Sequence, residues 1–278
     1  MKIYLIILIV IVVLVLITWF MCRRNAKPVL IDGTEGFRES FVYPEMNIKA
    51  AILFTVYKAD RYDYDFVEKY YKDIPFYIVN NGAETEWFKK MKELPGVHTL
   101  TRENKGWDIA GWKAGMNKWN DQLSQYDMVA FVNNSCVYLF DMYSFFAKSM
   151  GYDMYGVTHC MSPGMLYHVC TPFIAIGKNL YNSELFKQHW DGLRMDRNHN
   201  YAVNKHERAF SKKLKRLGYK VGVYDTFNGG LHLYRNHHAK KHYAKEFIKK
   251  TNILHAKKKD LDKQIDIIHR VNAENGYQ

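Results

Sequence analysis

Short apolar runs alternate with longer segments of helical pattern between residues 48 and 132. The apolar runs have the length and composition of buried strands and cover residues 48–56, 76–79, 97–100 and 128–132. The segments between them have helical character and cover residues 62–72, 84–94 and 107–119. Because strands that alternate with helices favour a mostly parallel sheet covered on both faces, we expect an α/β, Rossmann-like fold.

The carboxyl ends of the expected strands are the first place to look for a functional site. In parallel sheets of this kind, ligands bind in the crevice beyond those ends. The residues that directly follow Val56, Val79, Leu100 and Val132 are therefore the first candidates. A further strand is expected at 221–224 and a short segment at 231–233.

An uncharged apolar run stands at the N-terminus. From Ile3 to Cys22 the chain is dominated by Ile, Leu and Val, and it reaches the roughly 20 residues that a helix needs to cross a bilayer. No small-residue cleavage site follows the run, so a retained anchor is expected rather than a signal peptide. We expect a transmembrane anchor at 1–24 and a stalk of low regularity at 25–46.

The charges that flank this run favour a cytosolic domain. Arg23, Arg24 and Lys27 follow it, whereas Lys2 and the terminal amine precede it, which leaves an excess of about one charge on the domain side. The sequon that begins at Asn133 lies in the candidate site, where a glycan would obstruct chemistry. A lumenal domain is the alternative.

The chain is basic, with 40 Lys and Arg against 28 Asp and Glu and a formal charge of +12, which suits a phosphate-rich ligand or an anionic membrane surface. Many basic residues crowd residues 236–278, which we expect to be a helical extension with a solvated face or an attraction to acidic lipid headgroups. No nucleic-acid motif accompanies them, so no nucleic-acid partner is expected. The four cysteines lack zinc-like spacing.

Two polar segments follow the later strands. In the segment 103–112, Gly106 allows a tight turn close to a ligand, and Asp108 can accept hydrogen bonds from a ribose or a base. The alternative is an Asn-Gly turn with an acid that complements the helix dipole. The segment 126–135 ends in Asn133, Asn134 and Ser135, which could also be a plain polar strand end.

Two segments nearer the C-terminus add candidates. The segment 168–176 begins with His168, which could line a pocket or serve the structure alone. The segment 204–219 is an expected helix in which Glu207 shares a face with Phe210, Leu214 and Leu217. Alternatively, Asn204 and Glu207 form a capping box at the start of the helix.

The order and spacing of these four segments resemble those of rhamnan-synthesis-type glycosyltransferases, which are similar to the inverting family 2 enzymes of GT-A fold. The resemblance covers roughly residues 48–235 and implies a GT-A-like domain at 47–235. It implies that Asn104, Gly106 and Asp108 lie beside the nucleotide of a nucleotide-sugar donor.

The resemblance also aligns Asn133 and Ser135 with the metal-binding Asp-x-Asp of GT-A enzymes. Because both acids are missing, no metal ligand is assigned, and a divalent cation (Mn²⁺ or Mg²⁺) is a doubtful cofactor. Hydrogen bonds from Asn133, Asn134 and Ser135, helped by basic side chains, would hold the diphosphate instead.

For the acceptor side, the resemblance aligns Glu207 with the catalytic base and His206 with its acidic neighbour. His168 falls on the acceptor-side strand, and His232 would return toward the diphosphate. We expect an inverting transfer of a hexose or deoxyhexose to a hydroxyl of a glycan acceptor, with Glu207 taking the proton of that hydroxyl. The alternative is a non-catalytic membrane protein that keeps the scaffold to bind a glycan or a nucleotide.

Overall fold

The computed structural model describes residues 48–138, 140–157, 159–160, 168–169, 173–194, 203–224 and 247–249. All of these residues belong to one compact unit, which lies within Tyr43–Gln278. The expected anchor at 1–24 and the expected stalk at 25–46 lie outside the described residues. Among the helices that are described, none is long and apolar enough to span a membrane.

Strands and helices alternate as expected over the first half of the described chain. In chain order the elements are β1 Ala50–Val56, α2 Arg61–Tyr70, β2 Phe76–Asn81, α3 Glu86–Lys92, β3 Val97–Arg102, α4 Trp107–Leu123, β4 Met128–Asn133, β5 Cys136–Tyr138, α5 Met142–Ser149, β6 Met154–Gly156, β7 His159–Cys160, β8 His168–Val169, β9 Phe173–Gly177, α6 Lys178–Tyr181, α7 Glu184–Asp191, η1 Val203–Ala209, α9 Phe210–Arg216, β10 Val221–Val223 and β11 Phe247–Lys249.

Seven of the described strands form one sheet in the order β10-β6-β9-β4-β1-β2-β3. Strands β3, β2, β1 and β4 pair in parallel, whereas β9 runs antiparallel to both β4 and β6. The sheet is therefore mixed and mostly parallel, which confirms the expected α/β, Rossmann-like class. Because the four parallel strands are neighbours, their carboxyl ends share one edge, which we call the carboxyl edge.

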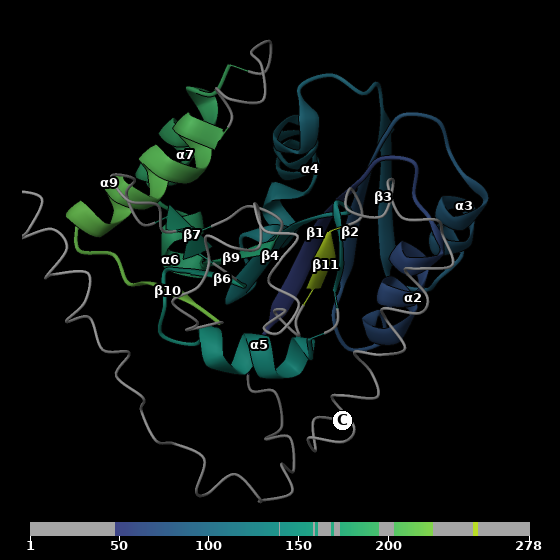
Figure 1. Cartoon of the computed structure of the whole chain (residues 1–278), viewed down its shortest axis with the longest axis horizontal. Coiled ribbons are helices and arrows are strands. Elements are labelled where there is room, and N and C mark those ends of the chain that lie inside the picture. Colours follow the sequence, from purple (N-terminus) through teal and green to yellow (C-terminus); the bar gives the residue numbers. More distant parts are fainter. Residues whose placement is uncertain are drawn as a thin grey trace, which may run out of the picture. The chain divides into compact units, whose positions relative to one another are not determined.

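Each face of the sheet carries its own buried core. One core joins the sheet to α2, α3 and α5, and the other joins it to α4, α6, α7 and α9. Figure 1 shows α5 and α4 on opposite sides of the sheet. Along β1 the two cores alternate, since Ile52 and Phe54 belong to the first and Ala51 and Leu53 to the second, as the period of two in a strand requires.

The helix α4 lies unusually close to the strands beneath it because two glycines face them. A Cβ atom on Gly111 would stand 2.6 Å from Cγ2 of Thr55, and one on Gly115 would stand 2.5 Å from Cδ1 of Leu53. Both distances are too short for non-bonded carbon atoms. The absence of side chains at these two positions therefore sets the distance between α4 and the sheet.

Two expectations for the later residues need correction. Phe210 and Leu214 are buried as expected, but Leu217 is 57% exposed because it follows the last residue of α9 and its backbone has left the helical conformation. Within the expected helical extension at 236–278, the structure describes only β11, which pairs antiparallel with β5 and is therefore a strand. The rest of the extension lies outside the described residues.

Candidate functional site at the carboxyl edge

On the face of the sheet that lies under α4, the side chains of β1, β2 and β4 change from apolar to polar at the carboxyl edge. Leu53, Val79 and Phe131 are buried under α4. Two residues further along β1, β2 and β4, the same rows end in Thr55, Asn81 and Asn133, all of which are buried. Because strand residues two apart share a face, these three polar side chains lie beneath the first turns of α4.

Asn133 and Asp108 form a short hydrogen bond in this position. Nδ2 of Asn133 donates to Oδ2 of Asp108 at 2.6 Å. Oδ1 of Asn133 accepts from the backbone N–H of Ser135 at 3.0 Å and from Oγ of Ser135 at 2.6 Å. The end of β4 and the first turn of α4 are thus joined through one carboxamide, and the expected grouping of Asp108, Asn133 and Ser135 is present.

The loop between β3 and α4 is fixed by a second group of hydrogen bonds. Arg102 donates from Nη1 to Oδ1 of Asn81 at 2.7 Å and from Nη2 to the carbonyl of Lys105 at 2.9 Å. Nδ2 of Asn81 donates to the carbonyl of Trp107 at 3.2 Å. These bonds tie the loop to the end of β2.

Gly106 and Trp107 give this loop its tight turn. Gly106 has φ +78° and stands at the N-cap of α4, as its role in a turn predicts. Trp107 has φ +60°, a left-handed conformation that is strained for a bulky residue. Strain of this kind persists where the surrounding structure enforces it, and it clusters at functional sites. Asn104 is exposed in the same loop.

Asn134 points to the opposite side of the sheet from Asn133 and holds the residue that follows β1. Its Oδ1 accepts from the N–H of Tyr57, and its Nδ2 donates to the carbonyl of Tyr57, both at 3.1 Å. Nδ2 also donates to Oδ2 of Asp63 at 2.9 Å. Asp63 in turn forms the capping box of α2 with Asp60. Asn134 therefore positions the loop after β1.

Two large aromatic side chains are exposed beside these groups. Tyr57 is 47% exposed and Trp107 is 55% exposed, although most aromatic side chains of the domain are buried. Both contact the C-terminal end of β2 or the turn that follows it, because the carbonyl of Trp107 is bonded to Asn81 and the ring of Tyr57 lies 3.4 Å from the Cβ position of Gly82. Exposed aromatic rings next to fixed polar groups suit the stacking of a planar base or the face of a sugar.

The same edge contains polar atoms that the protein leaves unsatisfied. Within the described residues, Oγ1 of Thr55 and Oδ1 of Asn80 are buried without a hydrogen-bond partner. A buried unsatisfied group costs about 1–3 kcal/mol. Departures of this kind from a well-satisfied fold are expected at functional sites.

The candidates on the acceptor side are only partly described. Glu207 lies in η1, but its side chain is outside what the structure describes, and so is the side chain of His168 in β8. His232 lies outside the described residues. Among the described residues η1 covers Val203–Ala209, and Asn204 therefore lies within it. The capping box that was the alternative for Glu207 would require Asn204 at the N-cap.

His206 is buried on the α4 side of the sheet rather than exposed at the edge. Its Nδ1 lies 3.0 Å from Nε2 of His189 in α7, and its ring lies near Trp112 and Trp190. Burial holds the pKa of His206 well below the usual value of a histidine. His206 is therefore neutral at pH 7, and its surroundings are those of a core residue.

The donor set at the carboxyl edge does not fit a hard divalent cation. Among the described residues, no three metal-ligating side chains gather. The carboxamide of Asn133, which stands where an acid would be needed, is engaged with Asp108 and Ser135. A hard cation prefers several carboxylate or carbonyl oxygens, so no chemical step is derived through a metal.

Several residues of the site were not singled out from the sequence. Tyr57 and Asn81 fall among the residues that follow strands, so position alone could have suggested them. The exposure of Tyr57 and the strained backbone of Trp107 carry no signal in the sequence. The bond between Arg102 and Asn81 joins residues 21 positions apart and required the register of β2 against β3.

The mostly parallel sheet and the polar groups at its carboxyl edge are those of a Rossmann-like α/β protein. The sequence model of the family described as RgpF, rhamnan synthesis protein F, matches residues 76–274, which is most of the chain. The chain therefore belongs to the rhamnan synthesis protein F family. No curated protein sequence matches it.

Several solved structures show distant similarity. The glycosyltransferase GlyE of Streptococcus pneumoniae in its apo form is 15% identical over 62% of this chain and 44% of that chain, with a TM-score of 0.38. A second GlyE structure is 13% identical over 64% and 45%, with a TM-score of 0.39. A cytidylyltransferase from Leptospira borgpetersenii is 11% identical over 64% and 76%, with a TM-score of 0.36. The chain thus spans less than half the length of the GlyE structures.

Proposed function

We propose that the protein transfers a sugar from a nucleoside diphosphate to a hydroxyl of a glycan, with inversion at the anomeric carbon. The observation that carries the proposal is the junction at the carboxyl edge, where Asp108, Asn133 and Ser135 are linked beside the exposed rings of Tyr57 and Trp107. Membership of a family named for rhamnan synthesis supports a sugar as the transferred group.

In this proposal the donor lies across the carboxyl edge. The base stacks on Tyr57 or Trp107, and Asp108 accepts a hydrogen bond from the ribose. Asn104 and Gly106 belong to the loop beside the nucleotide, where the lack of a side chain at Gly106 lets a ligand approach the backbone. Asn134 contributes indirectly, because it holds the peptide group of Tyr57.

The diphosphate would be stabilised by hydrogen bonds and cations in place of a metal. The hydroxyl of Ser135 lies at the site, and Lys58 and Lys105 are exposed in the loops that follow β1 and β3. Charge-assisted hydrogen bonds to phosphate are roughly twice as strong as neutral ones, so a few of them could offset the charge of the leaving group.

The transfer itself needs one base. The acceptor oxygen attacks the anomeric carbon, the bond from that carbon to the diphosphate oxygen breaks, and the nucleoside diphosphate leaves with the bonding electron pair. The carboxylate of Glu207 takes the proton of the attacking hydroxyl. His168 and His232 are proposed to line the acceptor side.

A donor panel tests the activity on the full-length chain purified in detergent. UDP-glucose, UDP-galactose, UDP-N-acetylglucosamine, GDP-mannose and dTDP-rhamnose are each incubated with it, and release of nucleoside diphosphate is measured. We expect one donor to be turned over, with the turnover kept when a chelator is added. If the protein binds nucleotide but releases none from any donor, it is a binding protein without catalysis. The presence of Asn133 and Ser135 in place of two acids favours this alternative.

Glu207→Gln tests the base. We expect turnover to fall by about 10²-fold or more, while donor affinity and melting temperature stay near those of the wild type, since a positioned base contributes about that factor. Glu184→Gln, the same change at an exposed acid of α7, is the matched control and should leave turnover unchanged. Wild-type turnover in Glu207→Gln would remove Glu207 from the mechanism.

The N-terminal run is proposed to anchor this domain to a membrane, with the domain on the cytosolic side. The proposal rests on the length of the uncharged run and on the cations that follow it. Lipid is therefore a proposed partner, alongside the donor and the glycan acceptor.

A further inference from the structure

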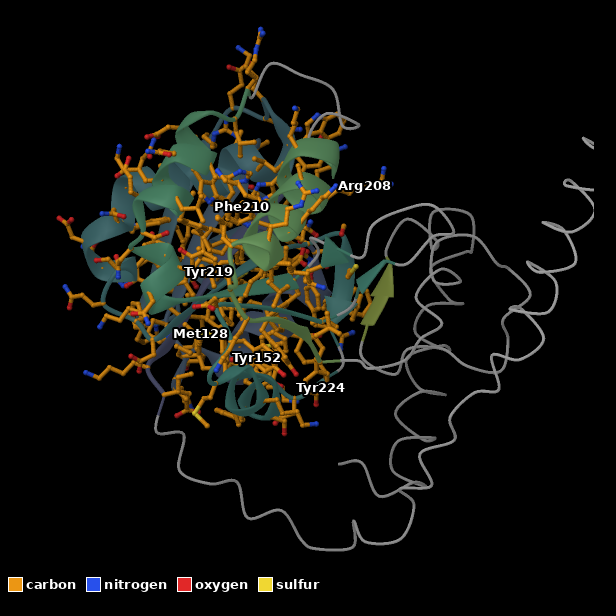
Figure 2. The ribbon with its side chains drawn as sticks, turned by 90° about the vertical axis from the view of Figure 1, so that its left-hand side faces the viewer. Met128, Tyr152, Arg208, Phe210, Tyr219 and Tyr224 are labelled. Carbon is orange, nitrogen blue, oxygen red and sulfur yellow. The ribbon has the colours of Figure 1, made fainter. Side chains whose placement is uncertain are left out.

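A hydrogen-bonded pair of histidines joins α7 to η1 inside the protein. Nε2 of His189 and Nδ1 of His206 are 3.0 Å apart. The ring of His189 stacks on Phe210 with centroids 3.9 Å apart, and the ring of His206 meets Trp190 edge to face at 4.5 Å. Figure 2 faces this side of the molecule, with Arg208 labelled in η1 and Phe210 labelled at the start of α9.

Both histidines are held in the neutral form. Burial lowers the pKa of His206 well below its usual value, and His189 adds to the effect. Burial, followed by the charge of Lys213, lowers the pKa of His189 to about 4. A neutral imidazole has one donor and one acceptor nitrogen, so the pair can form a single directed bond. Two imidazolium rings would offer only donors and could not form it.

The pair also contacts the structure beneath the carboxyl edge. The ring of His206 lies 6.2 Å from that of Trp112, whose Nε1 donates to the carbonyl of Val132 at 3.0 Å. Val132 directly precedes Asn133. From α4, Nζ of Lys113 donates to the carbonyl of Trp190 at 2.8 Å. His206 therefore links η1, the segment that contains Glu207, to the tryptophan that is bonded to the end of β4.

That segment has an uncommon backbone. η1 is a π-helix, and it passes directly into the α-helix α9 at Phe210. π-Helices are rare, are less favourable than α-helices, and occur frequently at functional sites. A change from π to α winding would rotate the residues of η1 relative to α9. The direction of the residue that follows His206 thus depends on what keeps the segment π-wound.

We propose that the hydrogen bond between His189 and His206 is a positioning contact, which holds η1 in its π-wound form and so sets where Glu207 stands relative to Asp108 and Asn133. The inference rests on the proposed role of Glu207 as the base. His206 touches neither donor nor acceptor in this proposal and acts through its neighbour. It deepens the proposed function by adding a second, buried determinant of turnover.

Two variants of the full-length chain separate this role from simple packing. His189→Phe keeps a ring on Phe210 but removes the hydrogen bond, whereas His189→Gln keeps a group that can donate or accept one. With the panel donor that releases the most nucleoside diphosphate, we expect His189→Phe to lower kcat by about 10-fold or more with little change in KM, because small misplacements of a catalytic group cost rate. His189→Gln should recover much of that loss.

Phe186→Leu is the matched control for packing. Phe186 lies in the same buried cluster and contacts Trp190 and Phe210, but it makes no hydrogen bond through its side chain. It should lower the melting temperature and leave kcat per folded molecule near that of the wild type. If His189→Phe behaves in the same way, the pair is a packing contact and the proposal is wrong.

A double variant tests whether the pair acts through Glu207. In the Glu207→Gln background, His189→Phe should lower kcat no further, because groups that act as one unit are not additive. Two effects that multiply would contradict the positioning role. If Glu207→Gln alone has wild-type turnover, the assignment of the base fails, independently of the histidines.

Hydrogen exchange tests the effect of the histidine pair on η1 without requiring a donor that is turned over. In the full-length chain, amides of residues 203–210 should exchange faster in His189→Phe than in the wild type or in Phe186→Leu. Unchanged exchange there would overturn the inference even if no donor of the panel is used.

Discussion

Two histidines in the core that joins the sheet to α4, α6, α7 and α9 make the fold sensitive to acid. His189 and His206 are neutral in the folded protein, and their pKa values lie below that of a histidine in an unfolded chain, near 6.5. The side chains packed against the pair are mainly aromatic, and Lys213 is the charged group that lowers the pKa of His189 further. A lysine cannot stabilise an imidazolium, so protonation has no compensating partner among these groups.

We therefore predict that stability falls as the pH is lowered from about 6.5 toward 4. In that range the unfolded chain binds protons that the folded chain excludes, and stability is lost wherever the unfolded state binds more protons. The pKa of about 4 for His189 corresponds to a loss on the order of 1–3 kcal/mol at the lower end. Urea unfolding at pH 7, 6, 5 and 4 measures this loss, and a His189→Phe, His206→Phe double variant should show a weaker dependence of stability on pH. An equally steep dependence in both proteins would contradict the assignment.

The sequence predicted those site residues that come after an expected strand. Asp108, Asn133 and Ser135 were expected together and are hydrogen-bonded. Asn134 was grouped with them, yet the period of two along a strand turns it to the other face, where it holds Tyr57. His189 was missed because nothing in the pattern of α7 distinguishes a histidine with a buried partner from an exposed one.

At the scale of elements, two glycines of α4 determine the separation of this helix from β1. The positions of most strands and helices followed from apolar periodicity, but this separation did not, because Gly111 and Gly115 could equally be read as weak points of a helix. The π-winding of η1 was also outside the reach of the pattern. A π-helix has about one residue more per turn than an α-helix, and its formation depends on tertiary contacts such as that of His206 with His189.

Gly111→Ala tests the separation of α4 from the sheet. Helix propensity alone would stabilise the variant by about 0.5–1 kcal/mol. A Cβ atom there would stand 2.6 Å from Cγ2 of Thr55 and 3.1 Å from Nδ2 of Asn81, and overpacking of this kind costs about 1–3 kcal/mol. We expect the clash to dominate, with a net loss near 1 kcal/mol in urea unfolding. A weaker nucleotide affinity should accompany it, because the helix carries Asp108.

The control for this variant is Asn117→Ala in the same helix. Asn117 is exposed, so the alanine gains helix propensity without any clash and should change stability by only a few tenths of a kcal/mol in the favourable direction. If Gly111→Ala is as stable as Asn117→Ala, the glycine does not set the position of α4.

At the scale of the whole molecule, the sequence predicted a mostly parallel sheet but not the order of the strands in it. Four parallel strands followed from the alternation of strands and helices. The antiparallel insertion of β9 between β4 and β6 brings together segments that are distant in the sequence, and no local pattern records such a pairing. The expected anchor at 1–24 depends only on composition, so its orientation can be tested independently of the fold.

We predict that the C-terminus lies on the cytosolic side of the membrane. Arg23, Arg24 and Lys27 follow the apolar run and Lys2 precedes it, and cations near the ends of a span are retained on the cytosolic side. In sealed inside-out vesicles, a C-terminal tag on the full-length chain should be removed by added protease. Moving the charges provides the control: with Arg23→Gln, Arg24→Gln and two lysines added near Lys2, the bias reverses and the tag should become protected. A tag that is protected in the unaltered chain would place the domain on the opposite side of the membrane. In a host with a secretory compartment, the sequon at Asn133 would then be accessible to the glycosylation enzymes.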